Sequence, residues 1–379
     1  MLKFLSLAAL AFTVAACGRD AVAPDTSLLA APSFARGGTS VGAVYTQSNA
    51  AGGNAVLVFS RASDGSLSPA GSFATNGNGT GAGLGSQGAV ALSEDGRYLF
   101  AVNAGSNSIT SFAVNGTSLT RITTVASGGT TPISLTVHGD LLYVLNGGAP
   151  ENITGFTVSP SGDLAILGGS SRPLSGSGVG PAEVSFDPTG SWLVVTEKAT
   201  NLIDVYAVGG NGYASAPVVN PSAGLTPFGF AFNQHGVLIV SEAFGGAANA
   251  SAVSSYTLGA GGVLQVVSAS VPTTETAACW VAVTNNGRFA YATNTGSASA
   301  TGFEVRHAAL SILDADGRTG ETGTTPIDAA ISHNGQFLYT LNAGAHTISA
   351  FDIAANDGTL SAVGGAAGLP ASAVGLAAW

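Results

Sequence analysis

The chain has 379 residues, of which 54 are glycine and only 8% are charged, and its formal net charge is −10 at pH 7. With 11 basic residues against 21 acidic ones, it lacks the basic surface that nucleic-acid binding requires. The same balance is poorly suited to an anionic membrane surface. We therefore expect no nucleic-acid partner and no direct membrane contact by the folded part of the chain.

The first residues have the features of an export signal. Lys3 precedes an apolar run over residues 4–16, which at thirteen residues is too short to span a bilayer. The run ends in VAAC, which resembles the lipobox of bacterial lipoproteins, with Cys17 as the residue that receives the lipid. Ordinary secretory cleavage beside Cys17 is the alternative. We predict a signal peptide over residues 1–16, then the lipidated Cys17 and a flexible tether rich in Ala, Gly, Ser and Pro up to residue 40.

From residue 41 onward one unit repeats. Its marker is a turn glycine that recurs at intervals of 43 to 51 residues, at Gly96, Gly139, Gly190, Gly236, Gly287 and Gly335. Each copy has a short apolar strand, the turn, a strongly apolar strand, a loop of small residues, a third strand and a weaker fourth strand. These segments are rich in Val, Phe, Tyr and Thr and show no helical period. Four antiparallel strands per unit are typical of a propeller blade.

The two ends of the chain complement each other. Six complete units account for residues 86 to about 366, while the segment from residue 41 supplies three strands and lacks a first one. The C-terminal ASAVGLAAW matches a first strand, with Gly375 in the place of Ala89 of the first full unit. We therefore predict an all-β, seven-bladed propeller over residues 41–379, whose ring is closed by the C-terminal strand joining the N-terminal blade.

The repeats of the form Y-V-x-N-x-G followed by I-x-x-F resemble those of the seven-bladed lactonase family. Its members include the propeller-type 6-phosphogluconolactonases and the carboxymuconate cyclases. PFGFAF, CWVAVT and GRFAYATN look most like a bacterial branch of lactonase-like proteins, and with Cys17 we expect a lipoprotein of that branch. The resemblance implies the propeller fold and a lactonase or cycloisomerase reaction, although a fold alone does not fix the reaction.

A recurring slot at the end of the second strand holds a neutral amide in some units and a carboxylate in others. Four copies carry Asn103, Asn146, Asn294 and Asn342, whereas two adjacent copies carry Glu197 and Glu242. Strand order places this slot on the top face, where we expect the Asn side chains to cap tight loops. A carboxylate cannot donate hydrogen bonds, so Glu197 and Glu242 are candidate catalytic groups, with loop acceptors as the alternative. By the resemblance, VVTE places Glu197 at the family's catalytic-candidate Glu.

A second slot lies fourteen residues before the first, near the top of the innermost strand. Glu183, Trp280 and Asp328 occupy it in three units where small residues are expected, and we predict that they contact a ligand. Glu183 is the third catalytic candidate, while Trp280 and Asp328 are substrate-binding candidates; contact with solvent or with each other is the alternative. Arg172, in a connector, is the best available cation for a substrate carboxylate or phosphate, or else a solvated loop residue.

One motif departs from the family's pattern. The family's enzymes carry a sequence like G-P-R-H before the strand of the candidate Glu, but this chain has GPAE, with Ala182 and Glu183 at those positions. The change removes an anion-binding group and an acid/base group, and Glu183 would repel an anionic substrate. A neutral or cationic substrate is therefore expected if the protein is an enzyme. No grouping of residues has metal-ligand spacing, so we expect neither a metal nor another cofactor.

Two functions of different classes remain open. The first is an exported hydrolase or isomerase of a lactone-type small molecule, with Glu197 as general base and Trp280 as a wall of the pocket. The second is a non-catalytic lipoprotein of the cell envelope that binds a glycan, polymer or protein with its top face. The retained Glu197 favours the first, and the missing Arg and His favour the second. We expect a monomer that contacts the membrane only through its lipid.

Overall fold

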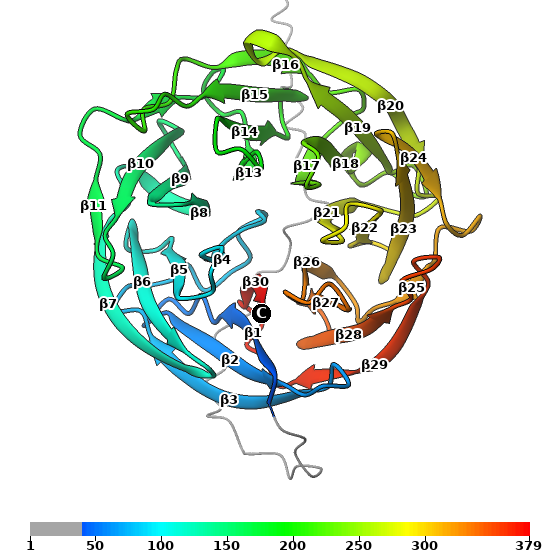
Figure 1. The fold of residues 1–379 in the computed structure, drawn as a ribbon, viewed down its shortest axis with the longest axis horizontal. Helices are drawn as coiled ribbons and strands as arrows, with labels where there is room; N and C mark the ends of the chain where they lie inside the picture. Colours follow the sequence, from blue (N-terminus) through cyan, green and yellow to red (C-terminus); the bar gives the residue numbers. More distant parts are fainter. Residues whose placement is uncertain (1–39) are drawn as a thin grey trace, which may run out of the picture.

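The computed structural model describes residues 40–379 and shows seven antiparallel sheets arranged as blades around a central channel (Figure 1). The predicted signal peptide, Cys17 and the tether up to residue 39 lie outside the described residues. Among residues 40–379, no helix has the length and apolar character needed to cross a bilayer. The predicted all-β, seven-bladed propeller is confirmed.

In each blade the strands follow one another from the channel outward. Blade one contains β30 (Val374–Ala378), β1 (Gly42–Gln47), β2 (Ala55–Arg61) and β3 (Leu67–Ala74). Blade two contains β4 (Val90–Leu92), β5 (Tyr98–Asn103), β6 (Ser108–Asn115) and β7 (Ser118–Ala126). Blade three contains β8 (Thr130–His138), β9 (Leu141–Gly148), β10 (Asn152–Val158), β11 (Leu164–Ile166) and the short β12 (Arg172–Pro173).

The remaining four blades repeat this order. Blade four contains β13 (Pro181–Phe186), β14 (Trp192–Glu197), β15 (Leu202–Ala207) and β16 (Val218–Pro221). Blade five contains β17 (Pro227–Phe232), β18 (Val237–Glu242), β19 (Ala252–Leu258) and β20 (Leu264–Pro272), with 3₁₀ turns at Phe244–Gly246 and Ala260–Gly262. Blade six contains β21 (Ala278–Val283), β22 (Phe289–Asn294), β23 (Ser299–Arg306), β24 (Ala309–Ile312) and β25 (Gly320–Glu321), and blade seven contains β26 (Pro326–Ile331), β27 (Phe337–Asn342), β28 (Thr347–Ile353) and β29 (Leu360–Ala367).

The core of the molecule lies between neighbouring blades. The second strand of each full unit is apolar along nearly its whole length and is buried on both faces, as in β18 and β27. Phe100 and Val102 of blade two, for example, pack with Leu142 and Val144 of blade three. This packing explains why the second strands do not alternate between apolar and polar residues, because neither face of the sheet meets water.

The ring is closed by the C-terminal strand, as predicted, but its register differs by one residue. β30 pairs with β1, and the backbone N–H of Trp379 donates to the carbonyl of Ala43 at 2.8 Å. Gly375 lies in a bulge with a positive φ of 75°, a conformation that favours glycine. Leu376, rather than Gly375, therefore stands in the register of Glu183. The expected match of Gly375 with Ala89 is wrong by this one residue. Gly375 instead matches Gly88, which has nearly the same φ of 76°, and the same register shift recurs in the first strands of blades three to seven.

Candidate functional site

The Asn slot holds the second and third strands of a blade together. Asn103 ends β5 and is fully buried, and its Nδ2 donates to Ser108 Oγ at 3.2 Å and to Thr110 Oγ1 at 2.9 Å. These partners lie five and seven residues further on, and the same spacing recurs at Asn294 and Asn342. At these three positions the amide bonds to side-chain hydroxyls across the hairpin rather than to loop backbone. Asn146 differs, because its Nδ2 donates to Asn152 Oδ1 at 3.0 Å and to the Ser127 carbonyl of the preceding connector at 3.3 Å.

Glu242 occupies this slot in blade five and accepts three hydrogen bonds. The donors are the Gly224 backbone N–H at 2.8 Å, Ser254 Oγ at 2.5 Å and Ser270 Oγ at 2.6 Å. The side chain is fully buried, and this burial raises the pKa of Glu242. Glu242 thus joins a connector, the third strand and the fourth strand, and all of these contacts are structural.

Glu197 occupies the slot in blade four. Ser175 donates to it through its backbone N–H at 3.0 Å and its Oγ at 2.6 Å, and Thr200 Oγ1 donates at 2.6 Å. Glu197 itself is fully buried, while Ser175 and Thr200 are exposed above it. Glu197 therefore does not face solvent, because these two hydroxyl residues cover the carboxylate.

Asp204 completes this site and was missed by the sequence analysis. It lies seven residues after Glu197, is fully buried, and accepts the Ser175 backbone N–H at 2.9 Å. Burial, followed by the charge of Glu197, raises the pKa of Asp204 to about 8. The sequence does contain a signal for Asp204. Seven residues after the slot, the units of Asn103, Asn294 and Asn342 carry Thr or Ser, whereas the unit of Glu197 carries an acid.

The second slot forms a closed layer across the central channel. Residues two apart on a strand face the same side, so the first strands line the channel in successive layers. The slot layer is buried throughout and consists of Ala89, Ser134, Glu183, Gly229, Trp280, Asp328 and Leu376. Glu183, Trp280 and Asp328 are thus together in one layer, as their spacing predicts, and strand pairing adds Leu376 to it.

Glu183 and Asp328 line the same cavity of about 200 Å³ in this channel, together with Gln87, Leu135 and Leu376. Glu183 comes from blade four and Asp328 from blade seven. The Phe230 backbone N–H donates to Glu183 Oε2 at 2.7 Å, and the Ala329 backbone N–H donates to Asp328 Oδ1 at 2.8 Å. Asp328 Oδ2 is buried and makes no hydrogen bond of normal geometry within residues 40–379.

Both carboxyl groups retain their protons more strongly than exposed ones would. Burial, and then the charge of Asp328, raises the pKa of Glu183 well above its usual value. Burial likewise raises the pKa of Asp328, and the neighbouring backbone N–H groups of Ala329 and Leu376 offset only part of this effect. Both shifts favour the protonated form of the group concerned, and the like charge adds to this effect at Glu183.

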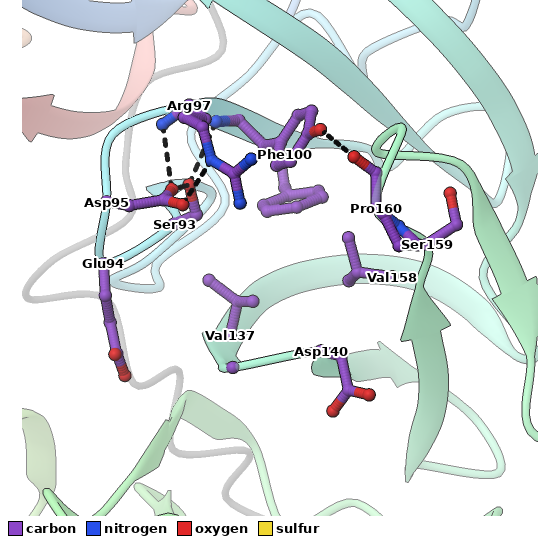
Figure 2. Close-up of a pocket in the computed structure, with 12 residues that line it drawn as sticks. Ser93, Glu94, Asp95, Arg97, Phe100, Val137, Asp140, Val158, Ser159 and Pro160 are labelled. Carbon is purple, nitrogen blue, oxygen red and sulfur yellow. Dashed lines mark hydrogen bonds and ion pairs between the residues drawn. The ribbon is translucent and has the colours of Figure 1, made fainter.

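A groove lies beside the channel between blades two and three (Figure 2). It encloses about 370 Å³ and shares Val137 with the channel cavity. Phe100, Val137 and Val158 give it an apolar floor, and the carboxylates of Glu94 and Asp140 lie at its rim (Figure 2).

Trp280 and Arg172 are held by contacts within the fold. The ring of Trp280 packs edge-on against Phe228 with centroids 4.7 Å apart, and its Nε1 is buried with no hydrogen-bond partner in the described part of the chain. Arg172 donates from Nε to the Ala214 carbonyl at 2.7 Å, and its Nη1 donates to two further carbonyls. Both substrate-binding roles stay predictions, and most of the donors of Arg172 are already used by the backbone.

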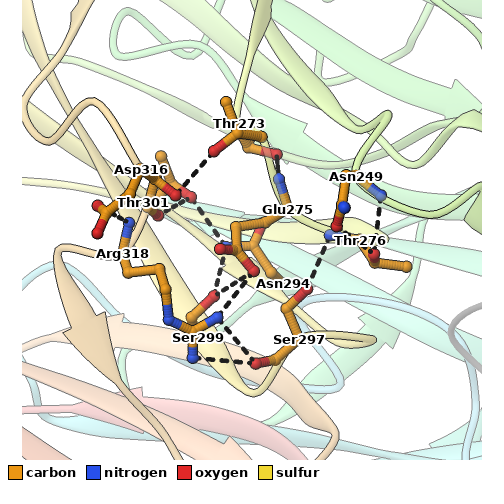
Figure 3. Close-up of polar contacts among 12 residues, drawn as sticks. Asn249, Thr273, Glu275, Thr276, Asn294, Ser297, Ser299, Thr301, Asp316 and Arg318 are labelled. Atoms are coloured by element: carbon orange, nitrogen blue, oxygen red, sulfur yellow. Dashed lines mark hydrogen bonds and ion pairs between the residues drawn. The ribbon is translucent and has the colours of Figure 1, made fainter.

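Charged residues of the connectors near blade six are paired with one another (Figure 3). Arg318 Nη1 lies 3.0 Å from Glu275 Oε2, and the same guanidinium pairs with Glu321. Ser299 Oγ also donates to Glu275 Oε2 at 3.3 Å. These groups therefore tie the connectors of blades six and seven together.

The structure divides the predicted site residues into separate places. Glu183 and Asp328 share the channel cavity, whereas Glu197 and Glu242 each have their own set of hydrogen-bond donors with no donor in common. Within residues 40–379, no group of three or more His, Cys, Asp or Glu side chains is arranged to hold a metal ion. The channel cavity is thus the one place among these residues where two predicted site residues line a common space.

A family model described as "Lactonase, 7-bladed beta-propeller" matches residues 52–172 and 180–374. The chain belongs to this lactonase family. The interval between the two matched segments contains Ser175, which covers Glu197. A search of curated proteins found no match.

The solved structures of the same fold include proteins that are named as gluconolactonases. A candidate 6-phosphogluconolactonase of Bacteroides fragilis is 19% identical, with a TM-score of 0.69, and the match covers 90% of this chain and 98% of that one. A periplasmic gluconolactonase of Pseudomonas aeruginosa is 18% identical, with a TM-score of 0.68, and the match covers 89% and 98%. A Lactobacillus plantarum protein is 17% identical, with a TM-score of 0.72, and the match covers 90% and 100%. At these identities the likeness concerns the fold.

Proposed function

We propose that this lactonase-family protein is an exported hydrolase or isomerase of a small neutral lactone, acting in the channel cavity. The observation that carries the proposal is that two buried carboxyl groups, Glu183 and Asp328, face one cavity from different blades. Membership of the family supports the lactone class, and so do the names of two of its structural neighbours. Export is supported by residues 1–17 of the sequence and by the periplasmic location of the Pseudomonas aeruginosa neighbour.

Hydrolysis needs one carboxylate and one protonated carboxyl group. The ionised group takes a proton from a water molecule as the water oxygen attacks the ring carbonyl carbon. The protonated group donates its proton to the ring oxygen as the carbon–oxygen bond breaks, which yields a hydroxy acid. We assign the base role to Glu183 and the acid role to Asp328, and one proton exchanged between them restores the starting state.

The cavity limits the substrate. Its volume of about 200 Å³ lies below the roughly 300–1,000 Å³ typical of small-molecule sites, so a single small ring is favoured. The acidic lining repels anionic substrates such as phosphorylated lactones. In this proposal Glu197 and Glu242 are structural acceptors rather than catalytic groups, because all of their observed partners belong to the fold.

The test is lactone turnover by the purified protein and two variants. Glu183→Gln and Asp328→Asn should each lower kcat/KM for a neutral lactone such as δ-gluconolactone by about 10²–10⁴-fold, the usual contribution of a general acid or base. Asp314→Asn changes an exposed carboxylate on a turn and is the matched control. Unchanged turnover in both channel variants would exclude this site. Saturable lactone binding without turnover in the unaltered protein would favour the non-catalytic alternative.

A further inference from the structure

We infer that the ligand reaches Glu183 and Asp328 from the face that carries the turns between first and second strands. We call this the bottom face. The opposite end of the channel is closed by residues 85–88, which we call the plug segment. This inference rests on the proposed function for its ligand, but its geometry is independent of turnover. From the sequence we had expected the site on the top face, which is the opposite face.

The plug segment crosses the channel and bonds to three other blades. The Gln87 side chain is bonded to the backbone of Val281 in blade six, donating from Nε2 at 2.8 Å and accepting at Oε1 at 3.1 Å. The Gln87 backbone N–H donates to the Ala182 carbonyl of blade four at 3.1 Å, and Ser86 Oγ donates to the Ile133 carbonyl of blade three at 2.7 Å. Figure 1 shows the chain before β4 running toward the centre of the ring.

Two further residues fit the plug segment. Lys198 Nζ donates to the Gly85 carbonyl at 2.6 Å, and this ammonium group also lies 4.5 Å from the centre of the Phe228 ring. At Gly229 in the slot layer, a Cβ atom would lie only 2.3 Å from Gln87 Oε1. The backbone carbonyl oxygen of Cys279 would lie 2.7 Å from the same Cβ, so glycine fits this crowded position between Gln87 and the neighbouring blade. The plug segment is therefore held in the channel by specific contacts with several blades.

The channel opens in the other direction. Two residues further along each first strand, toward the bottom face, the next layer holds only small side chains: Ala91, Thr136, Ser185, Ala231, Ala282, Ala330 and Ala378. All of these except Ala282 are partly exposed, whereas every residue of the slot layer is buried. Exposure therefore rises with distance from the plug segment, and the cavity of Glu183 and Asp328 is reached past this small-residue layer.

The groove of Figure 2 lies beside this opening and gives room for a substituent on the ring. Val137 borders both spaces, and Phe100 and Val158 offer apolar contact. Arg97 in the groove is paired with Asp95, so Glu94 and Asp140 leave an excess of negative charge that disfavours anions. The substrate class that fits is a small neutral ring with an apolar or cationic substituent.

Chemical labelling of the carboxyl groups tests the access route without an activity assay. A small dialkylcarbodiimide reacts with a protonated carboxyl group to form an O-acylisourea, and added glycinamide then displaces the urea to leave an amide. Peptide mass spectrometry should find this adduct on Glu183 or Asp328 of the unaltered protein. Ser185→Trp narrows the opening on the bottom face and should slow this labelling by about tenfold. Thr136→Trp is a second variant from a different blade, and thermal unfolding checks that both are folded.

Ser177→Trp adds the same bulk to an exposed connector on the top face and should leave the labelling rate unchanged. Labelling that is unaffected in folded Ser185→Trp and Thr136→Trp, or that requires opening the plug with Gln87→Gly, would overturn the inference. Absence of labelling in every variant would also overturn it. If labelling follows the expected pattern while no lactone is turned over, the access route holds and the proposed function fails.

Discussion

Asp204 is buried against Glu197 at the position where other blades place a hydroxyl beside an amide. Asn103, Asn294 and Asn342 each donate to a hydroxyl seven residues later, whereas Glu197 meets a second acid at that spacing. The backbone N–H of Ser175 donates to both carboxyl groups, at 3.0 Å and 2.9 Å. Two acids in contact need a shared proton, so this hairpin depends on pH in a way that the Asn hairpins do not.

Stability should therefore fall as the pH rises. The pKa of Asp204 is about 8 in the folded chain against an ordinary value of 3.8, so the folded chain holds a proton that the unfolded chain releases in this range. The contribution of Asp204 is complete below about pH 4 and is lost progressively up to about pH 8. Asp204→Asn should raise the free energy of unfolding by about 1–3 kcal/mol at pH 9 and much less at pH 4. Thermal unfolding at both pH values measures this difference, and an equal effect at both would refute the shared proton.

Replacing Asn342 by Ala should lower the free energy of unfolding by about 1–2 kcal/mol, because the hydroxyls of Thr347 and Ser349 lose their amide donor. Asn356→Ala, in an exposed turn, should change the free energy of unfolding by less than about 0.5 kcal/mol.

Glu197→Gln should lower the free energy of unfolding little, or even raise it above pH 8, since an amide removes the repulsion with Asp204. Denaturant unfolding of the three variants compares them directly. A large loss in Glu197→Gln would mean that its negative charge is itself required.

Deletion of residues 371–379 should destabilise the whole propeller by more than about 3 kcal/mol, because it removes β30 and leaves the edge of β1 unpaired. The deletion also removes the Trp379 carbonyl, which accepts from Arg61 Nε at 3.2 Å. Differential scanning calorimetry of the shortened chain measures the effect. An unchanged Tm would contradict closure by the C-terminal strand.

Cys17→Ser should move the protein from the detergent-requiring membrane fraction to the soluble exported fraction, because we expect the lipid to be its anchor. Cell fractionation followed by immunoblotting compares the two forms. Ser6→Ala, within the predicted signal peptide, is a control that should not change the distribution. The same distribution for both proteins would show that Cys17 is not the site of lipidation.

The sequence alone was sufficient for the architecture. Turn glycines such as Gly96 and Gly335, and the apolar strands that follow them, are local features, and each hairpin forms from residues close together in the chain. Repetition of this unit fixed the number of blades, and the incomplete ends predicted the closure between β30 and β1. The slot residues Glu183 and Asp328 were also found from spacing alone, because first strands of equal register must meet at the channel.

Only the tertiary structure decided which of these residues act together. Strand pairing decided that Leu376, rather than Gly375, stands in the register of Glu183. The seven-residue spacing of Glu197 and Asp204 is local, but their burial beneath Ser175, which comes from the connector before blade four, depends on the packed propeller. The plug segment depends on contacts such as that of Gln87 with Val281, which are 194 residues apart in the sequence. Closed packing of seven blades brings these groups together, and a periodic pattern within one blade carries no information about which distant loop will fill the channel.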